Sequence, residues 1–287
     1  MVEVDKPLSH TLSLSVRMLT FLFWNIAKKP LEQAITRLVA KHRVDFLMLA
    51  ESELDPPSLV AQLAASVGTP YTFQPSDRRK LQVYSGSATG RVVEQYVDPT
   101  GALTVRRLDL PAAPGILVAI LHMVSKVNWS ITAQAMHSVE LAGDIRRVEG
   151  DVGHTRTLLV GDFNMNPFEP GVVGMQALHA VMTRHQLRRG SRTVQGREYS
   201  MFYNPMWGLF GDRTPGPAGT FLHRSPPPDS TVWNIYDQVL LRPQLADRLT
   251  TVEVLDSDGT DPLVDGNGLP SQAGGSDHLP LLFRLDV

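Results

Sequence analysis

The chain has 287 residues, of which 43% are hydrophobic, so it is long enough to build a substantial core as one large domain or two small ones. Its 27 basic and 29 acidic side chains leave a formal net charge of -2, which excludes a globally basic nucleic-acid-binding protein but leaves a local basic surface open. The absence of cysteine excludes disulfides, thiolate zinc sites and cysteine nucleophiles. A metal ion would need Asp, Glu, Asn or His side chains, a donor set that favours hard cations such as Mg²⁺ or Mn²⁺.

The N-terminal part of the chain does not have the pattern of a targeting segment. Residues 1–16 are mixed polar, which predicts an extension or an early edge strand ahead of one domain over residues 17–287. The apolar run Leu19–Ile26 lacks the basic region and the small-residue cleavage site of a signal peptide. No apolar run reaches the roughly 20 residues that span a bilayer. We therefore expect a cytoplasmic protein, with a cysteine-free exported protein as the alternative.

Strands and helices alternate over the first half of the chain. Pro30 stands where a first helical turn begins, and Pro56 opens a second helix that runs to about Val67. Between Tyr71 and Leu110, apolar runs separated by glycine predict antiparallel strands. The buried strands predicted in this half are Leu19–Asn25, Phe46–Glu51 and Ile116–His122.

The second half begins with a long helix and ends in strands. Ser130–Val148 is predicted to be helical, with a core-facing side that includes Ile131 and Val139. A further helix is predicted within Val172–Leu187, and residues 190–229, rich in Gly, Pro and Arg, are expected to be mostly loop. The strands predicted in this half are Thr157–Asp162, Ile235–Leu241, Val252–Leu255 and Leu279–Leu285. The whole pattern predicts an α/β protein with mixed sheets and helices outside.

Polar side chains that can bind metal or phosphate stand at the ends of five buried runs. Asn25, Glu51 and His122 follow the first three runs. The other two are Asp162, which begins the triplet Asp-Phe-Asn, and Asp277, which stands just before the last strand. An isolated buried carboxylate is costly, so each one needs a cation, a hydrogen-bond donor or a shifted pKa. A divalent ion with carboxylates and histidines suits phosphate-ester hydrolysis, because the metal stabilises charge that develops on the phosphoryl oxygens.

Each of these residues also has an ordinary structural interpretation. Asp162-Phe163-Asn164 is a sequence that often forms a turn or caps a helix, and Glu51 is suited to cap the helix that follows it. A lone His122 is more often a hydrogen-bonded core histidine than a catalyst. We interpret the residues as one site because their order and their strand context agree at every position.

The motifs resemble those of the endonuclease/exonuclease/phosphatase superfamily, which includes pancreatic-type DNase, abasic-site endonucleases, deadenylases, inositol polyphosphate phosphatases and bacterial sphingomyelinases. The matching motifs are Trp24-Asn25, Ala50-Glu51, Leu121-His122, Gly161-Asp162-Phe163-Asn164, Tyr236-Asp237-Gln238-Val239-Leu240 and Ser276-Asp277-His278-Leu279-Pro280. The resemblance covers nearly the whole chain. It implies a DNase-like four-layer α/β sandwich, in which two packed mixed β-sheets are flanked by helices. It also implies that water attacks phosphorus with the help of Mg²⁺, for which Mn²⁺ can substitute.

The resemblance implies a metal site and a nucleophile site. Glu51 matches the main metal ligand, and Asn25 and Asp277 match residues near the same ion. Asp162 matches the residue that orients or deprotonates the attacking water. Asn164 matches the residue that holds the phosphate.

Two histidines complete the set that the resemblance implies. His278 matches the residue that contacts the scissile phosphate, and Asp237 matches the residue that orients it. His122 matches the position at which DNase-like members use a histidine near the leaving oxygen, whereas abasic-site endonucleases use tyrosine there. Inositol phosphatases carry a Trp-x-Asp-Arg pattern at the Asp237 motif, and this chain departs from that pattern with Tyr236-Asp237-Gln238.

Candidate substrate contacts come from aromatic and basic residues in the loops. Trp207 and Trp233 lie near the Asp237 motif in sequence, and aromatic side chains beside a phosphate site can stack on bases. The alternative is that both tryptophans only pack loops onto the sheet. Arg188 and Arg189 belong to a basic cluster within residues 184–197, and a smaller cluster occupies residues 78–80. Such clusters usually coat a solvated face, but they can also grip a phosphate backbone.

These features favour a Mg²⁺-dependent nuclease that acts on nucleic acid. A phosphatase or phosphodiesterase for a small or lipid-linked phosphate is the first alternative. The second alternative is a catalytically silent binding module, which is disfavoured because no expected catalytic residue is missing. DNA versus RNA and endo- versus exonuclease action stay open at this point.

Overall fold

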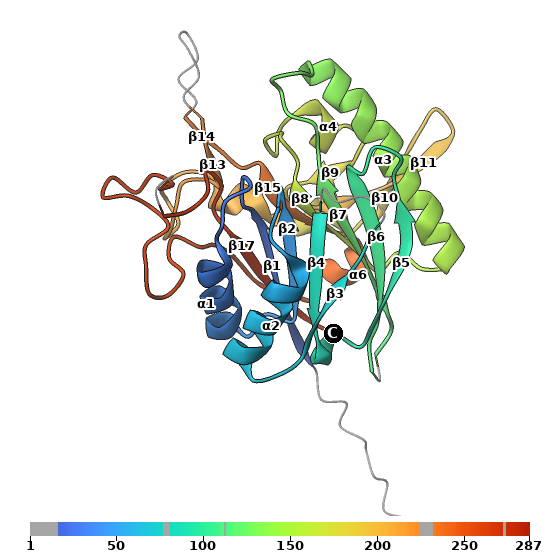
Figure 1. Cartoon of the computed structure of the whole chain (residues 1–287). Coiled ribbons are helices and arrows are strands. Elements are labelled where there is room, and N and C mark those ends of the chain that lie inside the picture. The colour runs from blue at the N-terminus through green and yellow to red at the C-terminus, as the bar shows by residue number, and fades with distance from the viewer. Residues whose placement is uncertain (1–16, 77–80, 112, 224–231, 272–273) are drawn as a thin grey trace, which may run out of the picture.

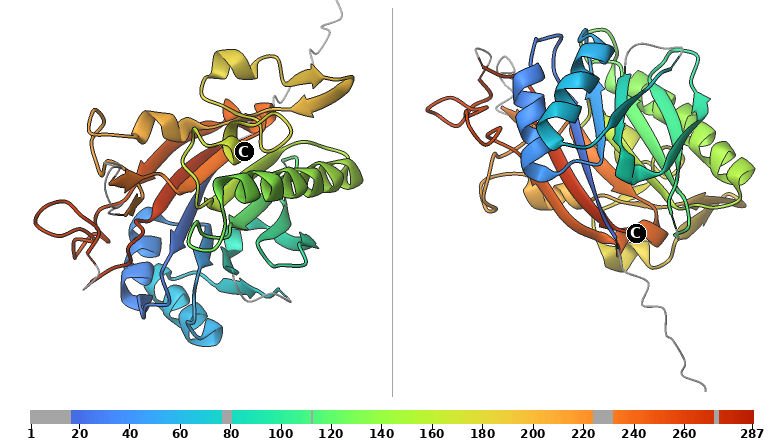
Figure 2. Two further views of the ribbon diagram at one scale, coloured as in Figure 1. Left: turned by 90° about the horizontal axis from the view of Figure 1, so that it is seen from above. Right: turned by 60° about the horizontal axis from the view of Figure 1, so that its bottom comes forward.

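The chain folds into four layers, with two large β-sheets packed face to face and helices on their outer faces (Figure 1). This computed structural model describes residues 17–76, 81–111, 113–223, 232–271 and 274–287. The predicted extension at 1–16 and the small basic cluster at 78–80 lie outside the described residues. The architecture is the DNase-like α/β sandwich that the motifs implied, and Figure 2 shows it from two further directions.

The first large sheet has the strand order β16-β17-β1-β2-β4-β3. Its strands are β1 (Met18–Asn25), β2 (Phe46–Ala50), β3 (Tyr71–Gln74), β4 (Leu81–Gly86), β16 (Leu249–Val254) and β17 (Leu281–Asp286). The central strands β1 and β2 are parallel, and Asn25 lies opposite Ala50 at their ends. Since β17 is antiparallel to β1, the chain enters β17 at the same edge at which β1 and β2 end.

The second large sheet has the strand order β5-β6-β7-β8-β15-β12-β9. Its strands are β5 (Arg91–Val97), β6 (Leu103–Asp109), β7 (Ile116–His122), β8 (Thr157–Asp162), β9 (Ala180–Val181), β12 (Phe202–Tyr203) and β15 (Asp237–Leu241). Strands β7 and β8 are parallel, with His122 opposite Asp162. Strand β15 is antiparallel to β8 and begins with Asp237 opposite Asp162.

The core between the sheets follows from the alternation of side chains along each strand, which sends successive residues to opposite faces. In β1, Phe21 and Phe23 face the other sheet, whereas Leu22 and Trp24 face the helices. All four side chains are fully buried. Strands buried on both faces have continuous apolar sequences, which is why these strands could be predicted.

Three long helices cover the outer faces: α1 (Glu32–His42) and α2 (Pro56–Val67) lie on the first sheet, and α3 (Ile131–Val152) lies on the second. Asp55, rather than Glu51, caps α2 by accepting from the Ser58 backbone N–H at 3.0 Å.

The predicted core-facing side of α3 is partly wrong, because Ile131 and Val139 are exposed. The side that packs on the sheet comprises Leu141, Ala142, Ile145 and Val148. None of the helices in the described ranges has the length and apolar composition needed to cross a membrane.

The helix predicted within Val172–Leu187 is confirmed only as the single turn α5, because the rest of the segment is broken into other short elements. It contains the end of α4 (Pro170–Val173), the edge strand β9 and α5 (Arg184–Leu187). His179 adopts a left-handed backbone with φ 49°, which interrupts a helix, and the next residue pairs with β12. Tertiary pairing at the sheet edge therefore limits the helix in this segment to one turn.

The stretch predicted as mostly loop contains short strands as well. Two small two-stranded sheets are formed by β10 (Ser191–Val194) with β11 (Arg197–Ser200) and by β13 (Phe221–Leu222) with β14 (Trp233–Asn234). Gln195 and Gly196 both have positive φ between β10 and β11, the geometry of a tight hairpin turn. The remaining short elements are the 3₁₀ turns η1 (Ser87–Thr89) and η2 (Pro205–Leu209) and the helix α6 (Pro243–Ala246).

Gly161 allows β7 and β8 to approach each other just before their functional ends. A Cβ atom at this position would lie 1.8 Å from the carbonyl oxygen of Leu121, and the backbone φ is 156°. No side chain fits there unless the backbone of β7 moves. The glycine therefore permits the register that sets His122 beside Asp162.

We expect Gly161→Ala to lower the free energy of unfolding by about 3 kcal/mol, at the upper end of the cost of overpacking a core. Gly150→Ala is a matched control, because nothing lies within 4 Å of a Cβ built at this position in α3. Relieving a helical glycine should raise stability by about 0.5–1 kcal/mol. Urea unfolding of the two variants measures both changes, and equal stabilities would contradict the steric role of Gly161.

Candidate active site

The polar residues predicted from the strand ends meet at one edge of the sandwich. The parallel strands β1, β2, β7 and β8 end there, and the antiparallel strands β15 and β17 begin there. The two sheets are joined at this edge by Asn25, whose side-chain Nδ2 donates to Asp162 Oδ2 at 3.1 Å. Topology thus gathers six strand ends that are far apart in sequence.

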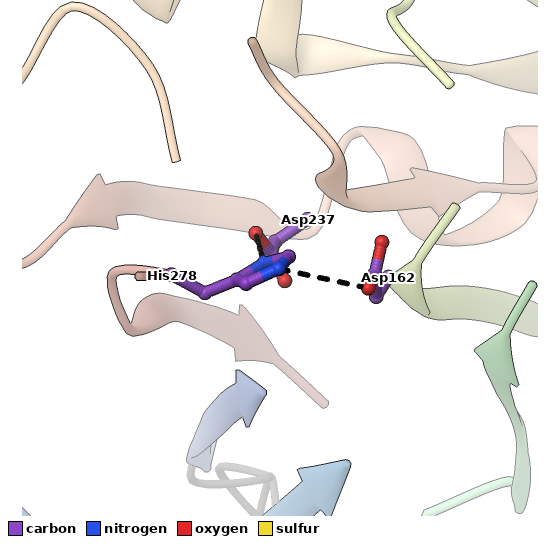
Figure 3. Close-up of side chains that lie close together, drawn as sticks. All are labelled: Asp162, Asp237 and His278. Atoms are coloured by element: carbon purple, nitrogen blue, oxygen red, sulfur yellow. Dashed lines mark hydrogen bonds and ion pairs between the residues drawn. The ribbon is translucent and has the colours of Figure 1, made fainter. Parts of the chain in front are cut away.

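Asp237, His278 and Asp162 form the buried centre of this edge (Figure 3). His278 Nδ1 lies 2.8 Å from Asp237 Oδ2, and His278 Nε2 lies 3.9 Å from Asp162 Oδ2. The exposed fractions are 0% for Asp237, 1% for Asp162 and 6% for His278. Asp237 therefore holds one nitrogen of the imidazole while the other nitrogen faces the second carboxylate.

The surroundings of His278 favour its protonated form. Burial by itself opposes the charge, but the carboxylates of Asp237 and Asp162 outweigh burial and raise the pKa of His278 to about 10. Burial also raises the pKa of Asp237, while the facing His278 acts in the opposite direction. His278 Nδ1 therefore donates to Asp237 Oδ2, and Nε2 is available as a second donor.

A second group, Glu51 with His122, stands beside this centre. The Glu51 Oε1 atom lies 3.3 Å from His122 Nε2 and accepts from Asn25 Nδ2 at 3.2 Å. The hydrogen bond from His122, which outweighs the effect of burial, and the one from Asn25 lower the pKa of Glu51 to about 2. Glu51 also has φ 48°, a strained conformation that turns the chain away from β2. The carboxylate is therefore ionised at neutral pH and is partly exposed.

Asn25 and Asn164 fix the carboxylates rather than point into open space. Asn25 turns its amide nitrogen toward Glu51 and Asp162, while its oxygen accepts from the Ala27 backbone. Asn164 donates from Nδ2 to the Met123 carbonyl at 2.9 Å and to Asp162 Oδ2 at 3.2 Å. Asp162 is thus held by two asparagine side chains and by the Asn164 backbone N–H at 2.8 Å.

Sequence reasoning missed two residues that position His278. The Trp24 indole donates to the His278 carbonyl at 2.9 Å, and Thr220 Oγ1 accepts from the Asp237 backbone N–H at 3.0 Å. Phe221, next to Thr220, lies with its ring centroid 4.5 Å from that of His278. The signal for this segment is Gly219, because a Cβ there would lie 2.6 Å from the Asn234 carbonyl oxygen. A glycine required by close approach marks a packed segment inside an apparent loop.

Replacing Asp237 by Asn should lower turnover about 10–100-fold, the range typical for a partner that orients a functional histidine. The change keeps the volume but removes the charged acceptor at His278 Nδ1. Steady-state kinetics measure the loss, and the downfield imidazole N–H resonance in proton NMR should disappear with it. Asp247→Asn is the matched control, since this exposed carboxylate pairs with Arg184 beyond the other end of β15. Unchanged kinetics and an unchanged resonance in Asp237→Asn would contradict the positioning role.

The donor chemistry of this edge fits a divalent cation. The available ligand atoms are carboxylate oxygens and imidazole nitrogens, and oxygen-rich sets favour Mg²⁺ or Mn²⁺. Asp237 Oδ1 is buried and has no hydrogen-bond partner in the described part of the chain. Within those residues, the group of carboxylate and histidine donor atoms that lie within 4.8 Å of one another comprises Asp162, Asp237 and His278. Asp277 stands next to this group and accepts from Ser276 Oγ at 3.2 Å.

Two cavities flank the site. The first cavity, of about 1050 Å³, reaches Glu51 and His122 and is also lined by Glu53 and Asp55. In its described lining, Lys28 is the one permanent cation, and it pairs with Glu53 at 3.7 Å. The second cavity, of about 480 Å³, lies beside Asn164 on the other flank. Its lining includes Lys126, Phe168, Glu169, Phe221 and Tyr236.

The structure does not bring the predicted arginines to the site. Arg188 is exposed and lines a cavity with Pro243 and Asp247, just beyond the end of β15 that is remote from Asp237. Five strand residues separate these ends by roughly 15 Å. Arg189 is exposed beside Arg188 in the same turn. The sequence positions of Arg188 and Arg189 do not show at which end of the sheet their turn lies.

The two predicted tryptophans lie nearer to the site but are partly buried. Trp207 has its ring centroid 6.2 Å from that of Phe168, which lines the second cavity. Trp233 packs against the core between the first sheet and its helices. The positions of Trp207 and Trp233 agree with the alternative that both pack loops onto the sheet. The aromatic residues that line the second cavity beside the site include Phe168 and Phe221.

Comparison with known proteins identifies the family. A sequence profile of the Endonuclease/Exonuclease/phosphatase family matches residues 22–278. No curated protein sequence matches the chain.

Solved structures agree with this match. The chain is similar to an endonuclease/exonuclease/phosphatase family protein from Bacteroides thetaiotaomicron, with 14% identity and a TM-score of 0.56 over 94% of this chain and 98% of that one. It is also similar to an AP endonuclease from Archaeoglobus fulgidus, with 14% identity and a TM-score of 0.55 over 94% of this chain and 100% of that one. D. rerio TDP2 complexed with a single-strand DNA product is similar as well, with 14% identity and a TM-score of 0.56 over 94% and 99% of the two chains. These likenesses show the fold, and the profile match, which spans most of the sequence, shows that the chain belongs to the endonuclease/exonuclease/phosphatase family of phosphoester hydrolases.

Proposed function

We propose that the protein hydrolyses phosphodiester bonds of nucleic acid in a reaction that depends on Mg²⁺, with Mn²⁺ as a substitute. The observation that supports this most is the buried set of Asp237, His278 and Asp162, which presents an imidazole N–H and a carboxylate to the same space. Family membership supports the reaction class. AP endonuclease and a TDP2 bound to a DNA product share the fold, which favours nucleic acid as the substrate.

The proposed roles follow from how the neighbouring groups hold each side chain. Asp162 is held by neighbouring amides, and its carboxylate accepts a proton from the water that attacks phosphorus. His278 Nε2 donates to a phosphoryl oxygen, because Asp237 occupies Nδ1. His122 Nε2 lies on the Glu51 side and assists departure of the leaving oxygen.

The cation would be held by Glu51 and Asp277, with Asn25 keeping the carboxylates of Glu51 and Asp162 in place. When bound, it supplies Lewis-acid stabilisation of the charge that develops on the phosphoryl group. Glu51 suits this role because it is ionised and partly exposed. Asn164 supports the site by fixing Asp162.

A small or lipid-linked phosphate ester is the second candidate substrate. Polyanion binding relies on Lys and Arg along the path of the backbone. Among the described lining residues of the first cavity, Glu51, Glu53 and Asp55 outnumber Lys28, and Arg188 lies at the far end of β15. The charge of these described residues favours a substrate with few phosphates.

A substrate panel tests the proposed function. Labelled single- and double-stranded DNA and RNA are incubated beside bis(p-nitrophenyl) phosphate and a lipid phosphodiester, each with Mg²⁺. Cleavage of an oligonucleotide at a rate above that of the small esters supports the nuclease. Efficient hydrolysis of a small or lipid ester without nucleic-acid cleavage favours the second candidate, and hydrolysis of none of them contradicts both.

A further inference from the structure

Residues 184–200 form a basic arm outside the active site. The arm consists of α5, a turn and the hairpin of β10 and β11, which projects from the second sheet beside α3 (Figure 1). It carries five arginines and one carboxylate, that of Glu198, in a chain whose formal net charge is -2. The arm is therefore a local excess of positive charge on a nearly neutral protein.

The alternation of side chains along the hairpin separates its charges. Arg192 lies opposite Tyr199, and Arg197 is two residues from Tyr199 on the same strand, so these three side chains share one face. Glu198 lies on the other face, where it accepts from Ser191 Oγ. The hairpin therefore presents one face with two arginines and without a carboxylate of its own.

Arg146 of α3 completes this face of the hairpin. Its guanidinium lies over the Tyr199 ring, 5.8 Å from the ring centroid, and this cation–π contact holds it beside the two arginines of the hairpin. Arg192 and Arg197 are exposed. Among the described residues neither of them forms an ion pair, since the one carboxylate of the arm points to the other face. Both guanidiniums are therefore available to an anion.

The turn before the hairpin extends the positive surface. Arg188 and Arg189 are exposed there, and the Arg188 guanidinium lies 3.1 Å from His185 Nδ1, which does not neutralise it. Arg184 differs, because Asp247 holds it at 3.0 Å. Four arginines over residues 188–197 thus remain without a carboxylate partner in the part of the chain that the structure describes.

The arm is too far from the reacting centre to bind the reacting phosphate. Ser200, the last residue of the hairpin, accepts at its carbonyl from Arg242 at 3.0 Å, and Arg242 follows β15 at the end remote from Asp237. Strand β15 separates its two ends by roughly 15 Å. At a rise of ~3.4 Å per nucleotide, this distance corresponds to about four to five nucleotides. A small phosphate ester cannot reach both places, whereas a polymer can.

We propose that the basic arm binds the phosphate backbone of a nucleic acid at a position several nucleotides from the reacting centre. Arg192 and Arg197 are diagonal neighbours on the hairpin, roughly 7–8 Å apart, which is close to two base steps along a strand. Guanidinium groups pair with phosphates and also stack on bases. The proposal rests on the proposed function in naming nucleic acid as the polymer. It goes further by placing the affinity for a polymer outside the active site.

Fluorescence anisotropy of the whole protein in chelator measures this binding without turnover. The probe is a labelled single-stranded DNA of 20 nucleotides, titrated at several salt concentrations. Arg188→Gln with Arg189→Gln, and separately Arg192→Gln with Arg197→Gln, should each weaken binding about tenfold. Each pair should also lower the salt slope by roughly 1.4, because one phosphate contact to a single strand contributes roughly 0.7.

Two controls separate the arm from net charge and from the active site. Arg43→Gln with Arg91→Gln removes the same charge from exposed arginines at the end of α1 and the start of β5, and it should bind the DNA within twofold of the wild type. His278→Ala changes the reacting centre and should retain most of the affinity measured in chelator. Melting temperatures of both arm variants should equal that of the wild type, because the exchanged side chains are exposed.

Three results would overturn the assignment. The first is DNA binding by both arm variants within twofold of the wild type, with unchanged salt slopes. The second is an equal loss in the control variant of Arg43 and Arg91, which would make the effect one of net charge. The third is equally tight binding of a 20-residue polyglutamate, which carries similar charge but no bases and would indicate an acidic protein partner.

The binding test and the substrate panel fail independently. DNA binding at the arm without hydrolysis of any nucleic acid would remove the nuclease and keep the arm. Hydrolysis of nucleic acid with unaltered DNA binding in the arm variants would keep the nuclease and remove the arm.

Discussion

Replacement of Asp162 by Asn should reduce turnover by about 10²–10⁴-fold, the usual contribution of a positioned general base. The substitution keeps the side-chain shape and the contact with the Asn164 backbone, but it removes the group that accepts the proton of the attacking water. Steady-state kinetics on the best substrate of the panel measure the loss. Circular dichroism should show the wild-type fold, because only one oxygen is exchanged for an amide nitrogen.

Asp256→Asn is the matched control for this prediction. Asp256 is exposed in the loop after β16, so the same chemical change there should leave turnover unaltered. Turnover of Asp162→Asn within threefold of the wild type would show that Asp162 only links the two sheets through Asn25. A loss of ellipticity would assign the effect to folding instead.

Removal of divalent cations should bring hydrolysis down to background, and added Mg²⁺ or Mn²⁺ should restore it. The physical reason is that Glu51 and Asp162 bring negative charge toward a negatively charged phosphate, and a cation is needed to offset their repulsion. Zn²⁺ should be a poor substitute, since the proposed ligands are mostly oxygen atoms. Full activity in excess chelator would contradict the metal site.

A titration of Mg²⁺ against activity assigns the metal site to a residue. Glu51→Gln should raise the Mg²⁺ concentration that gives half-maximal activity about 10–100-fold, as expected for the loss of a charged ligand contact. Glu53→Gln is the matched control, because Glu53 lines the same cavity but is exposed and paired with Lys28. Similar titration curves for both variants would show that Glu51 acts through general charge and not as a ligand.

The strands and the two first helices were predictable because their local signals agree with their burial. Continuous apolar runs such as Phe46–Ala50 identify strands buried on both faces, and their ends could be read from the first polar residue. Local signals failed where sheet edges decide the structure. A helix was predicted within Val172–Leu187, yet the left-handed His179 and the pairing of β9 with β12 leave only the single turn α5.

The residues of the candidate site also differ in whether a local signal predicts them. Asn25, Glu51, His122, Asp162, Asp237 and His278 were predictable because each has a motif at a strand end. The motifs do not predict that Trp24 donates to the His278 carbonyl or that Thr220 accepts from the Asp237 backbone N–H. The arginine cluster looked like part of the site only in sequence, since Arg188 lies beyond the other end of β15.

The sequence by itself determined the family, the layered fold and the type of chemistry, because strand burial and motif order are local properties of the chain. Tertiary structure alone decided which groups meet. Strand direction brought six polar ends to one edge, and the antiparallel entry of β15 set Asp237 opposite Asp162. It also separated the arginines from the site. Distances between residues far apart in sequence depend on packing and register, which no local pattern encodes.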